Sequence, residues 1–120
     1  MNQQIKERWL AALTSGEYKQ TRQTLREDNR SDAENGYCYC CLGVLCDLYR
    51  QDHDDEATAF ATGVYPTAPV LIWADLSSKA ARSYAQMNDE HRMDFSEIAT
   101  EIATDVSHWG DYNQGPVGLS

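Results

Sequence analysis

Basic residues are scarce in this chain. Lys and Arg together number 10 among 120 residues, against 19 Asp and Glu, which gives a formal net charge of −9 and a pI of about 4.6. A surface of this charge repels nucleic acids and anionic membranes. We therefore expect no direct binding to nucleic acid and none to a membrane.

Long hydrophobic runs are also missing. The most apolar stretch, residues 37–49, is thirteen residues long, whereas a transmembrane helix needs about 20. Near the N-terminus, Lys6, Glu7 and Arg8 place charges where a secretory signal needs an uninterrupted apolar core. These absences predict a cytosolic protein.

Motifs for phosphate and metal binding are absent too. Gly36 and Gly43 lie too far apart for a glycine-rich nucleotide loop. Cys38 and Cys41 form one C-x2-C pair, but a structural zinc site needs a second pair of ligands. The histidines are isolated, at His53, His91 and His108. We expect neither a metal nor a cofactor.

The most prominent feature that is present is the apolar segment at residues 37–49. It carries one charge, Asp47, and its apolar residues cover every side of a helix rather than a single stripe. This pattern predicts an internal helix around which the other elements pack. All four cysteines lie within a span of nine residues in this segment. Disulfides between them could close only tiny loops, so we expect free thiols. They are Cys38, Cys40, Cys41 and Cys46.

Further helices are predicted on either side of this segment. Residues 3–15 carry apolar side chains at helical spacing and stop at Ser15-Gly16, a typical C-terminal glycine cap. Asp94-Phe95-Ser96-Glu97 is close to a capping box, with Asp in place of the usual Ser or Thr, and predicts a last helix from Phe95. Two shorter helices are predicted to begin around Pro69 and at Ser77 or Ser78.

The remaining segments predict loops and one hairpin. Residues 51–64 are charged or lack periodicity, which favours a solvated loop. Residues 18–39 allow a small β-hairpin with an exposed tip. We therefore predict a mainly α fold, with α+β as an option. It would be a compact helical domain around a buried central helix, spanning residues 1–109, with a flexible tail at 110–120.

An acidic row on the last predicted helix gives the first functional hypothesis. Its carboxylates recur every three or four residues, so they would lie on one face about 5 to 6 Å apart. Such a row could occupy the nucleic-acid site of a basic partner protein. An ordinary solvated helix face has the same pattern. The row consists of Asp94, Glu97, Glu101 and Asp105.

Polar residues in or beside apolar segments give a second hypothesis. Buried polar groups need partners, so these residues either satisfy one another or line a pocket for a small, nucleotide-like ligand. They are Tyr18, Gln20, Asp47, Asn88 and Asp89. An anionic ligand would also need arginines gathered near them, for which the candidates are Arg22, Arg26 and Arg82.

A cysteine nucleophile is the third hypothesis. Cys40 or Cys41 would begin the central helix, where the helix dipole lowers the pKa of a thiol, and a histidine brought near by folding could act as the base. His91, which follows Asn88-Asp89, is the candidate for that base. Because no such pairing is visible in the sequence, we expect a protein that is not an enzyme.

The chain resembles a group of small bacteriophage-encoded proteins of no established activity. Their pattern has an amphipathic first helix ending near Ser-Gly, then Y-x-Q with a following Leu, a G-[FY]-C-C-L-G-V-L-C-D-L block, an L-P…V…W-A-G-L segment, and L-N-D followed by F-x-E-I-A. The matching residues are Ser15-Gly16, Tyr18-Lys19-Gln20, Cys40 to Leu48, Pro69-Val70, Trp73-Ala74, Asn88-Asp89 and Phe95 to Ala99. Asp75 stands where the pattern has Gly, and Tyr37-Cys38-Tyr39 lengthens the entry to the cysteine block.

Charge, size and this resemblance together predict a phage-encoded, non-enzymatic inhibitor of a host factor. The expected target is a basic, nucleic-acid-handling protein of a defence system, such as CRISPR or restriction machinery, met in the host cytoplasm. The alternatives are a protein that sequesters a nucleotide-like host signal and a cysteine-dependent hydrolase. The sequence leaves the oligomeric state open.

Overall fold

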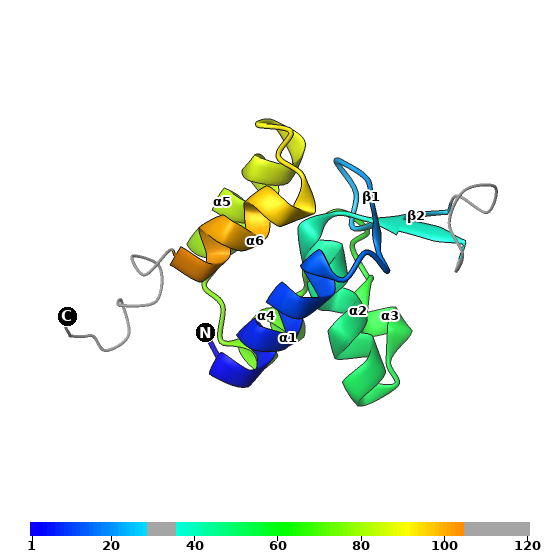
Figure 1. Cartoon of the computed structure of the whole chain (residues 1–120). Coiled ribbons are helices and arrows are strands. Elements are labelled where there is room, and N and C mark those ends of the chain that lie inside the picture. The colour runs from blue at the N-terminus through cyan, green and yellow to red at the C-terminus, as the bar shows by residue number, and fades with distance from the viewer. Residues whose placement is uncertain (29–35, 105–120) are drawn as a thin grey trace.

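The computed structural model describes residues 1–28 and 36–104, which form six helices and a small sheet (Figure 1). The predicted mainly α fold is confirmed, with a three-stranded sheet that makes it α+β. The elements are α1 (Gln3–Thr14), β1 (Lys19–Gln20), β2 (Arg26–Asp28), β3 (Tyr37–Tyr39), α2 (Cys41–His53), α3 (Glu56–Ala59), α4 (Ala68–Ala74), α5 (Ser78–Asp89) and α6 (Phe95–Thr104). The predicted tail at 110–120 and the tip of the hairpin lie outside the described residues.

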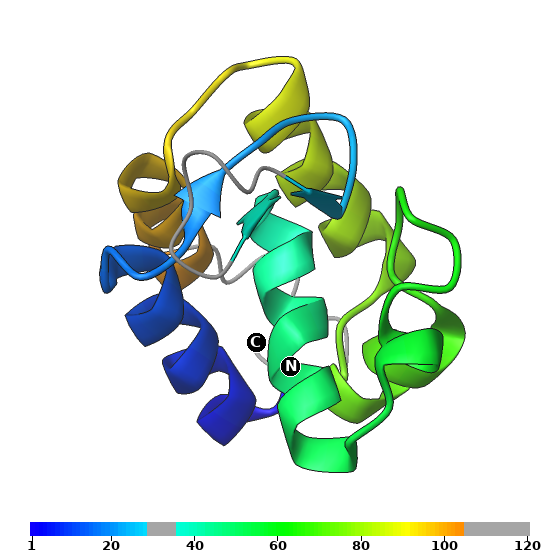
Figure 2. The same cartoon turned by 90° about the vertical axis from the view of Figure 1, so that its right-hand side faces the viewer.

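Helix α2 is the buried centre of the fold, as its composition predicts. Every residue from Cys41 to Tyr49 is buried, and α1, α3, α4 and α5 all pack against this helix. Figure 2 shows α2 between α1 on one side and α4 on the other. Trp9 of α1 is fully buried and donates its indole Nε1–H to the Cys41 carbonyl at 2.9 Å, which fixes α1 against the first turn of α2.

The sheet has the order β1-β3-β2 and lies at the N-terminal end of α2. Strands β2 and β3 are antiparallel and form the predicted hairpin, with Arg26 opposite Tyr39. Strand β1 adds to β3 in parallel, a pairing that the sequence did not reveal. Leu25 immediately precedes β2 and is fully buried, and its carbonyl accepts a hydrogen bond from Cys40 N at 3.2 Å.

The helix ends follow the expected capping chemistry. Asn2 caps α1 and Ser77 caps α5, each accepting a hydrogen bond from a backbone N–H of the first turn. After α1 the chain reaches Gly16, whose φ of +82° suits glycine. The capping box at α6 is confirmed: Asp94 N donates to Glu97 Oε1 at 2.9 Å, and Glu97 N donates to Asp94 Oδ1 at 2.8 Å.

The prediction of a continuous loop over residues 51–64 is wrong. Helix α2 continues to His53, and the short helix α3 follows it at once. Asp55 caps α3 by accepting a hydrogen bond from Thr58 N at 3.1 Å, and Ala59 is fully buried. A helix of four residues is too short to show periodicity, so only its packing against α2 and α4 could identify it.

Helix α6 packs against α1 and α5 through its apolar stripe. Phe95, Ile98 and Ile102 are buried, so the opposite face of α6 is left exposed to solvent. In the described part of the chain, no helix combines the length and the apolar character that crossing a membrane would require.

Candidate functional site

Three of the predicted ligand-binding residues come together around Asn88, which is fully buried. Asn88 Oδ1 accepts hydrogen bonds from Gln20 Nε2 at 2.8 Å and from Cys41 N at 3.2 Å. Asn88 Nδ2 donates to Thr21 O and to Asp89 Oδ1, both at 2.9 Å. Every hydrogen-bonding position of the Asn88 amide is therefore filled by the protein itself.

The neighbours of Asn88 are similarly engaged. Gln20 Nε2 also donates to the Met93 carbonyl at 2.8 Å, and Asp89 Oδ1 accepts a hydrogen bond from Gln23 N at 2.8 Å. These bonds tie β1, the start of α2 and the end of α5 into one unit. They favour the first of the two alternatives raised by the sequence, in which the polar residues satisfy one another rather than hold a ligand.

Tyr18 belongs to a different cluster. Its hydroxyl donates to Asp47 Oδ2 at 2.7 Å, and burial followed by this hydrogen bond raises the pKa of Tyr18. Asp47 is buried, and its carboxylate also accepts hydrogen bonds from Arg50 Nε at 2.7 Å and from Gln51 Nε2 at 3.0 Å. A buried carboxylate with three donors is well compensated, and here it fixes the position of Arg50.

A cavity of about 240 Å³ opens beside Asp47, and we call it the arginine cavity. It is lined by Arg26, Tyr37, Tyr39, Asp47, Arg50 and Glu56. The sequence did not predict this site. Arg50 follows Asp47 by one helical turn, which was a readable signal, but Arg26 joins them only through the pairing of β2 with β3.

The predicted gathering of Arg22, Arg26 and Arg82 does not occur. Arg26 pairs with Glu56, whereas Arg22 Nη2 donates to the Arg92 carbonyl at 3.3 Å in the loop after α5. Arg82 is exposed on α5. The three arginine side chains thus lie at separate places and do not form one binding site for an anion.

All four cysteines are free thiols and all are buried. Cys40 is the N-cap of α2, and its Sγ accepts a hydrogen bond from Gly43 N at 3.3 Å. Desolvation outweighs this bond and raises the pKa of Cys40 to about 11, and burial raises the pKa of Cys41 as well. The expected lowering by the helix dipole is therefore wrong, because burial outweighs it. Within residues 1–28 and 36–104, no group of three His, Cys, Asp or Glu could hold a metal.

We expect these thiols to react slowly in the folded protein and to make it sensitive to alkaline pH. Unfolded thiols ionise near pH 9, whereas Cys40 keeps its proton up to about pH 11. The contribution of Cys40 to the free energy of unfolding is therefore fully present below about pH 9. It is lost as the pH rises toward 11, at about 1.4 kcal/mol per pH unit. Thiol labelling at neutral pH and the midpoint of urea unfolding at neutral and alkaline pH measure both effects. Immediate labelling of several thiols without urea would contradict this expectation.

The predicted acidic row is exposed on α6 as far as the structure describes it. Asp94 and Glu97 bond reciprocally in the capping box, and Glu101 lies one turn further along. No Lys or Arg of the described residues pairs with Glu97 or Glu101. Asp105 lies outside the described residues. We call Asp94, Glu97 and Glu101 the acidic face.

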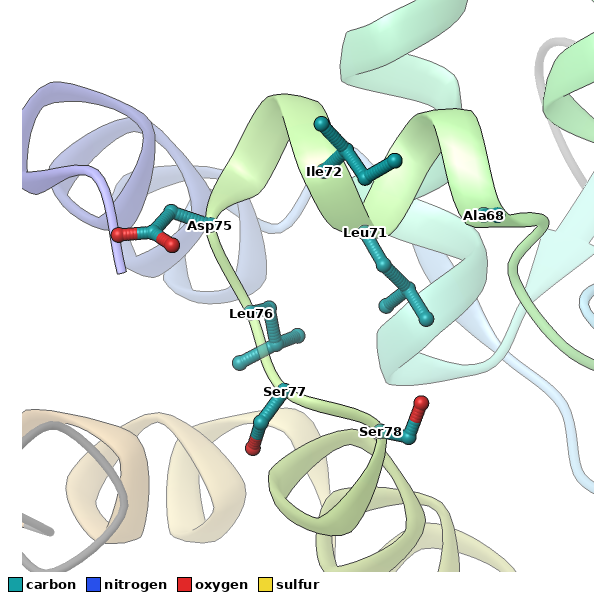
Figure 3. A pocket seen from close by; sticks show the side chains of 7 residues that line it. All are labelled: Ala68, Leu71, Ile72, Asp75, Leu76, Ser77 and Ser78. Carbon is teal, nitrogen blue, oxygen red and sulfur yellow. The ribbon is translucent and has the colours of Figure 1, made fainter. Parts of the chain in front are cut away.

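A cavity of about 370 Å³ forms an open groove between α4 and the start of α5 (Figure 3). Leu71 and Leu76 point into it, with Ser78 on the α5 side, whereas Ile72 points away and is 77% exposed. The polar side chains of its lining are the carboxylate of Asp75 and the hydroxyls of Ser77 and Ser78. The groove therefore offers apolar contact but no arrangement of groups for catalysis.

One family model matches the chain, that of a domain of unknown function (DUF8296), over residues 1–82. This segment is about two thirds of the sequence, so the chain belongs to that family. No curated protein and no solved structure matches it significantly. The arginine cavity lies within the matched segment, whereas Asn88 and the acidic face lie beyond it.

Proposed function

We propose that this chain is a non-enzymatic inhibitor, encoded by a phage or prophage, that acts in the bacterial cytoplasm. It would bind a basic, nucleic-acid-handling host protein, such as a component of CRISPR or restriction machinery, through the acidic face of α6. The observation that carries the proposal is that this face displays carboxylates without cationic partners among the described residues.

The geometry of α6 supports such a role in two ways. Its apolar stripe is buried against α1 and α5, so the helix cannot rotate to hide the carboxylates. The capping box also fixes Asp94 and Glu97 relative to the first turn. Charges held in this way pay little ordering entropy on binding, and a row of like charges accelerates the approach of a basic partner.

The charge balance supports the same proposal. Three arginines form ion pairs elsewhere, with Asp52, Glu56 and Asp47. Helix α6 itself carries no basic residue. With a net charge of −9, the protein would therefore present negative potential on α6, although the exposed Arg92 lies two residues before Asp94.

The other two hypotheses have less support. The donors and acceptors of the Asn88 amide already bond to other protein groups. The Cys40 and Cys41 thiols are buried and protonated at neutral pH. The Asn88 amide therefore has no unbonded donor or acceptor for a ligand, and the buried thiols present no reactive thiolate to solvent.

We expect the variant Glu97→Gln/Glu101→Lys to lose its partner. Gln at position 97 keeps a side-chain oxygen for the capping box, so the change acts on charge rather than on the fold. Tagged wild type and variant are used to capture proteins from a bacterial lysate, and the retained proteins are quantified. We expect recovery of the specific partner to fall about tenfold or more, as for loss of charge pairs across an interface.

The matched control is Glu17→Lys/Glu27→Gln, which changes the net charge by the same amount at residues outside α6. Both side chains are exposed, and Gln at position 27 can still accept the hydrogen bond from Thr21. The control should retain the partner. Equal capture by all three proteins, or equal loss in both variants, would contradict the proposed role of the acidic face.

A further inference from the structure

We propose that the arginine cavity binds the phosphate group of a small phosphomonoester. This site is separate from the acidic face, because α3 and β2 lie on the opposite side of the molecule from α6 (Figure 1). It also differs from the residues around Asn88, which the sequence suggested for a small ligand. Three features of the cavity lead to this inference.

The first feature is a pre-positioned guanidinium. The Arg26 side chain lies over the ring of Tyr37 at 4.3 Å and over the ring of Phe60 at 4.2 Å, measured to the ring centroids. Stacking on two rings holds the planar group in place and leaves its edge available for hydrogen bonds. Arginine held in this way is suited to bind a phosphate through two parallel N–H donors.

The second feature is another guanidinium with donors to spare. Arg50 Nε donates to Asp47 Oδ1, and the Arg50 side chain donates no other hydrogen bond to the described residues. Asp47 is itself held by Tyr18 and Gln51 through its other oxygen. The buried carboxylate thus positions Arg50 at the cavity, and its own oxygens are already occupied by donors.

The third feature is an anion that already occupies the site. Glu56 Oε2 accepts a hydrogen bond from Arg26 Nη2 at 2.8 Å. Its negative charge also interacts electrostatically with Arg50. The Glu56 side chain is 58% exposed and belongs to the four-residue helix α3, so it can leave at small cost. A phosphate that replaces it would carry more negative charge and more acceptor oxygens toward the same two arginines.

The test is calorimetric titration of the full chain with three probes: inorganic phosphate, adenosine 5′-monophosphate and adenosine. We expect the two phosphates to bind and adenosine not to bind. The side-chain Nε–H resonances of Arg26 and Arg50 should shift on addition of either phosphate. These signals report on the cavity directly and would not respond to binding elsewhere.

Two variants and a control sharpen the test. Glu56→Gln removes the competing carboxylate from an exposed position, and we expect it to bind phosphate about tenfold more tightly. Arg50→Gln should weaken binding by a similar factor. Arg82→Gln removes an exposed arginine on α5 and should leave binding unchanged.

Three results would overturn the proposal. One is that neither phosphate binds wild type or Glu56→Gln at millimolar concentration. Another is that adenosine binds as tightly as its monophosphate. The last is that Glu56→Gln fails to tighten binding. This test remains decisive even if Arg50→Gln does not fold. None of these results bears on the acidic face, whose test uses other variants and a protein partner.

Discussion

Replacing Gly43 by alanine is expected to destabilise the fold more than any other single change considered. Helix propensity alone would favour alanine at this position by about 1 kcal/mol. However, a Cβ on Gly43 would lie 1.8 Å from the Leu25 carbonyl oxygen and 2.7 Å from its carbon, and these are backbone atoms. The segment before β2 would have to move away from α2, breaking the hydrogen bonds that Leu25 makes with Cys40 and Gly63.

We expect Gly43→Ala to cost more than about 3 kcal/mol, a large part of the stability of a small domain. Thermal unfolding followed by circular dichroism measures the loss. Gly63→Ala is the matched control, because Gly63 has a φ of +79° but nothing within 4 Å of its added Cβ. The control should cost only about 1 to 2 kcal/mol of backbone strain. A Gly43→Ala protein as stable as this control would contradict the close approach of α2 to Leu25.

Replacing Asn88 by alanine is expected to have the second largest effect. The change would leave the Cys41 amide and the Thr21 carbonyl without their partner, and Gln20 Nε2 would keep only the Met93 carbonyl. Each unsatisfied group costs about 1 to 3 kcal/mol, and partial relaxation brings the expected total to about 3 to 5 kcal/mol. Urea unfolding measures this loss.

Hydrogen exchange gives the Asn88 prediction a local readout. In Asn88→Ala the amide of Cys41 should exchange much faster than in wild type, because its acceptor is gone. Gln86→Ala changes an exposed residue of the same helix and is the control. Unchanged exchange at Cys41, or equal stability of the two variants, would show that Asn88 does not link β1, α2 and α5.

Local chemistry explains why much of the fold could be predicted. The capping box at α6, the cap at Ser77 and the uniform apolar character of α2 depend on residues a few positions apart. The pairing of β2 with β3 also follows from neighbouring segments. In contrast, the parallel addition of β1 and the short helix α3 are set by tertiary packing, which leaves no periodic signal.

The candidate sites show the same division. The acidic row could be predicted because its spacing matches one helix face. The polar residues in or beside apolar segments could be listed from the sequence, but the sequence could not show that they divide into two clusters, in which Tyr18 pairs with Asp47 and Gln20 pairs with Asn88. The arginine cavity depends on strand register, which places Arg26 beside Tyr39 and brings it to Arg50. Such contacts between distant segments are visible only in the folded chain.

Burial also reversed one chemical expectation. The start of a helix usually favours a thiolate, yet Cys40 and Cys41 are both buried, with almost no exposed surface to solvate a charge, and Cys41 is bonded to Asn88 and Tyr84 of α5. Desolvation then dominates the pKa of both thiols. The cysteine block that marks this sequence therefore serves packing around α2, and the chemistry available to a partner lies on the surface.

The most direct test of the proposed function is the affinity for the captured partner as a function of salt, with a competing oligonucleotide. If α6 occupies the nucleic-acid site of a basic protein, the dissociation constant should rise steeply with salt, and the oligonucleotide should displace the protein. Glu97→Gln/Glu101→Lys should flatten that salt dependence. A partner that binds nucleic acid and this protein at the same time, with an affinity that salt does not change, would contradict binding through the acidic face.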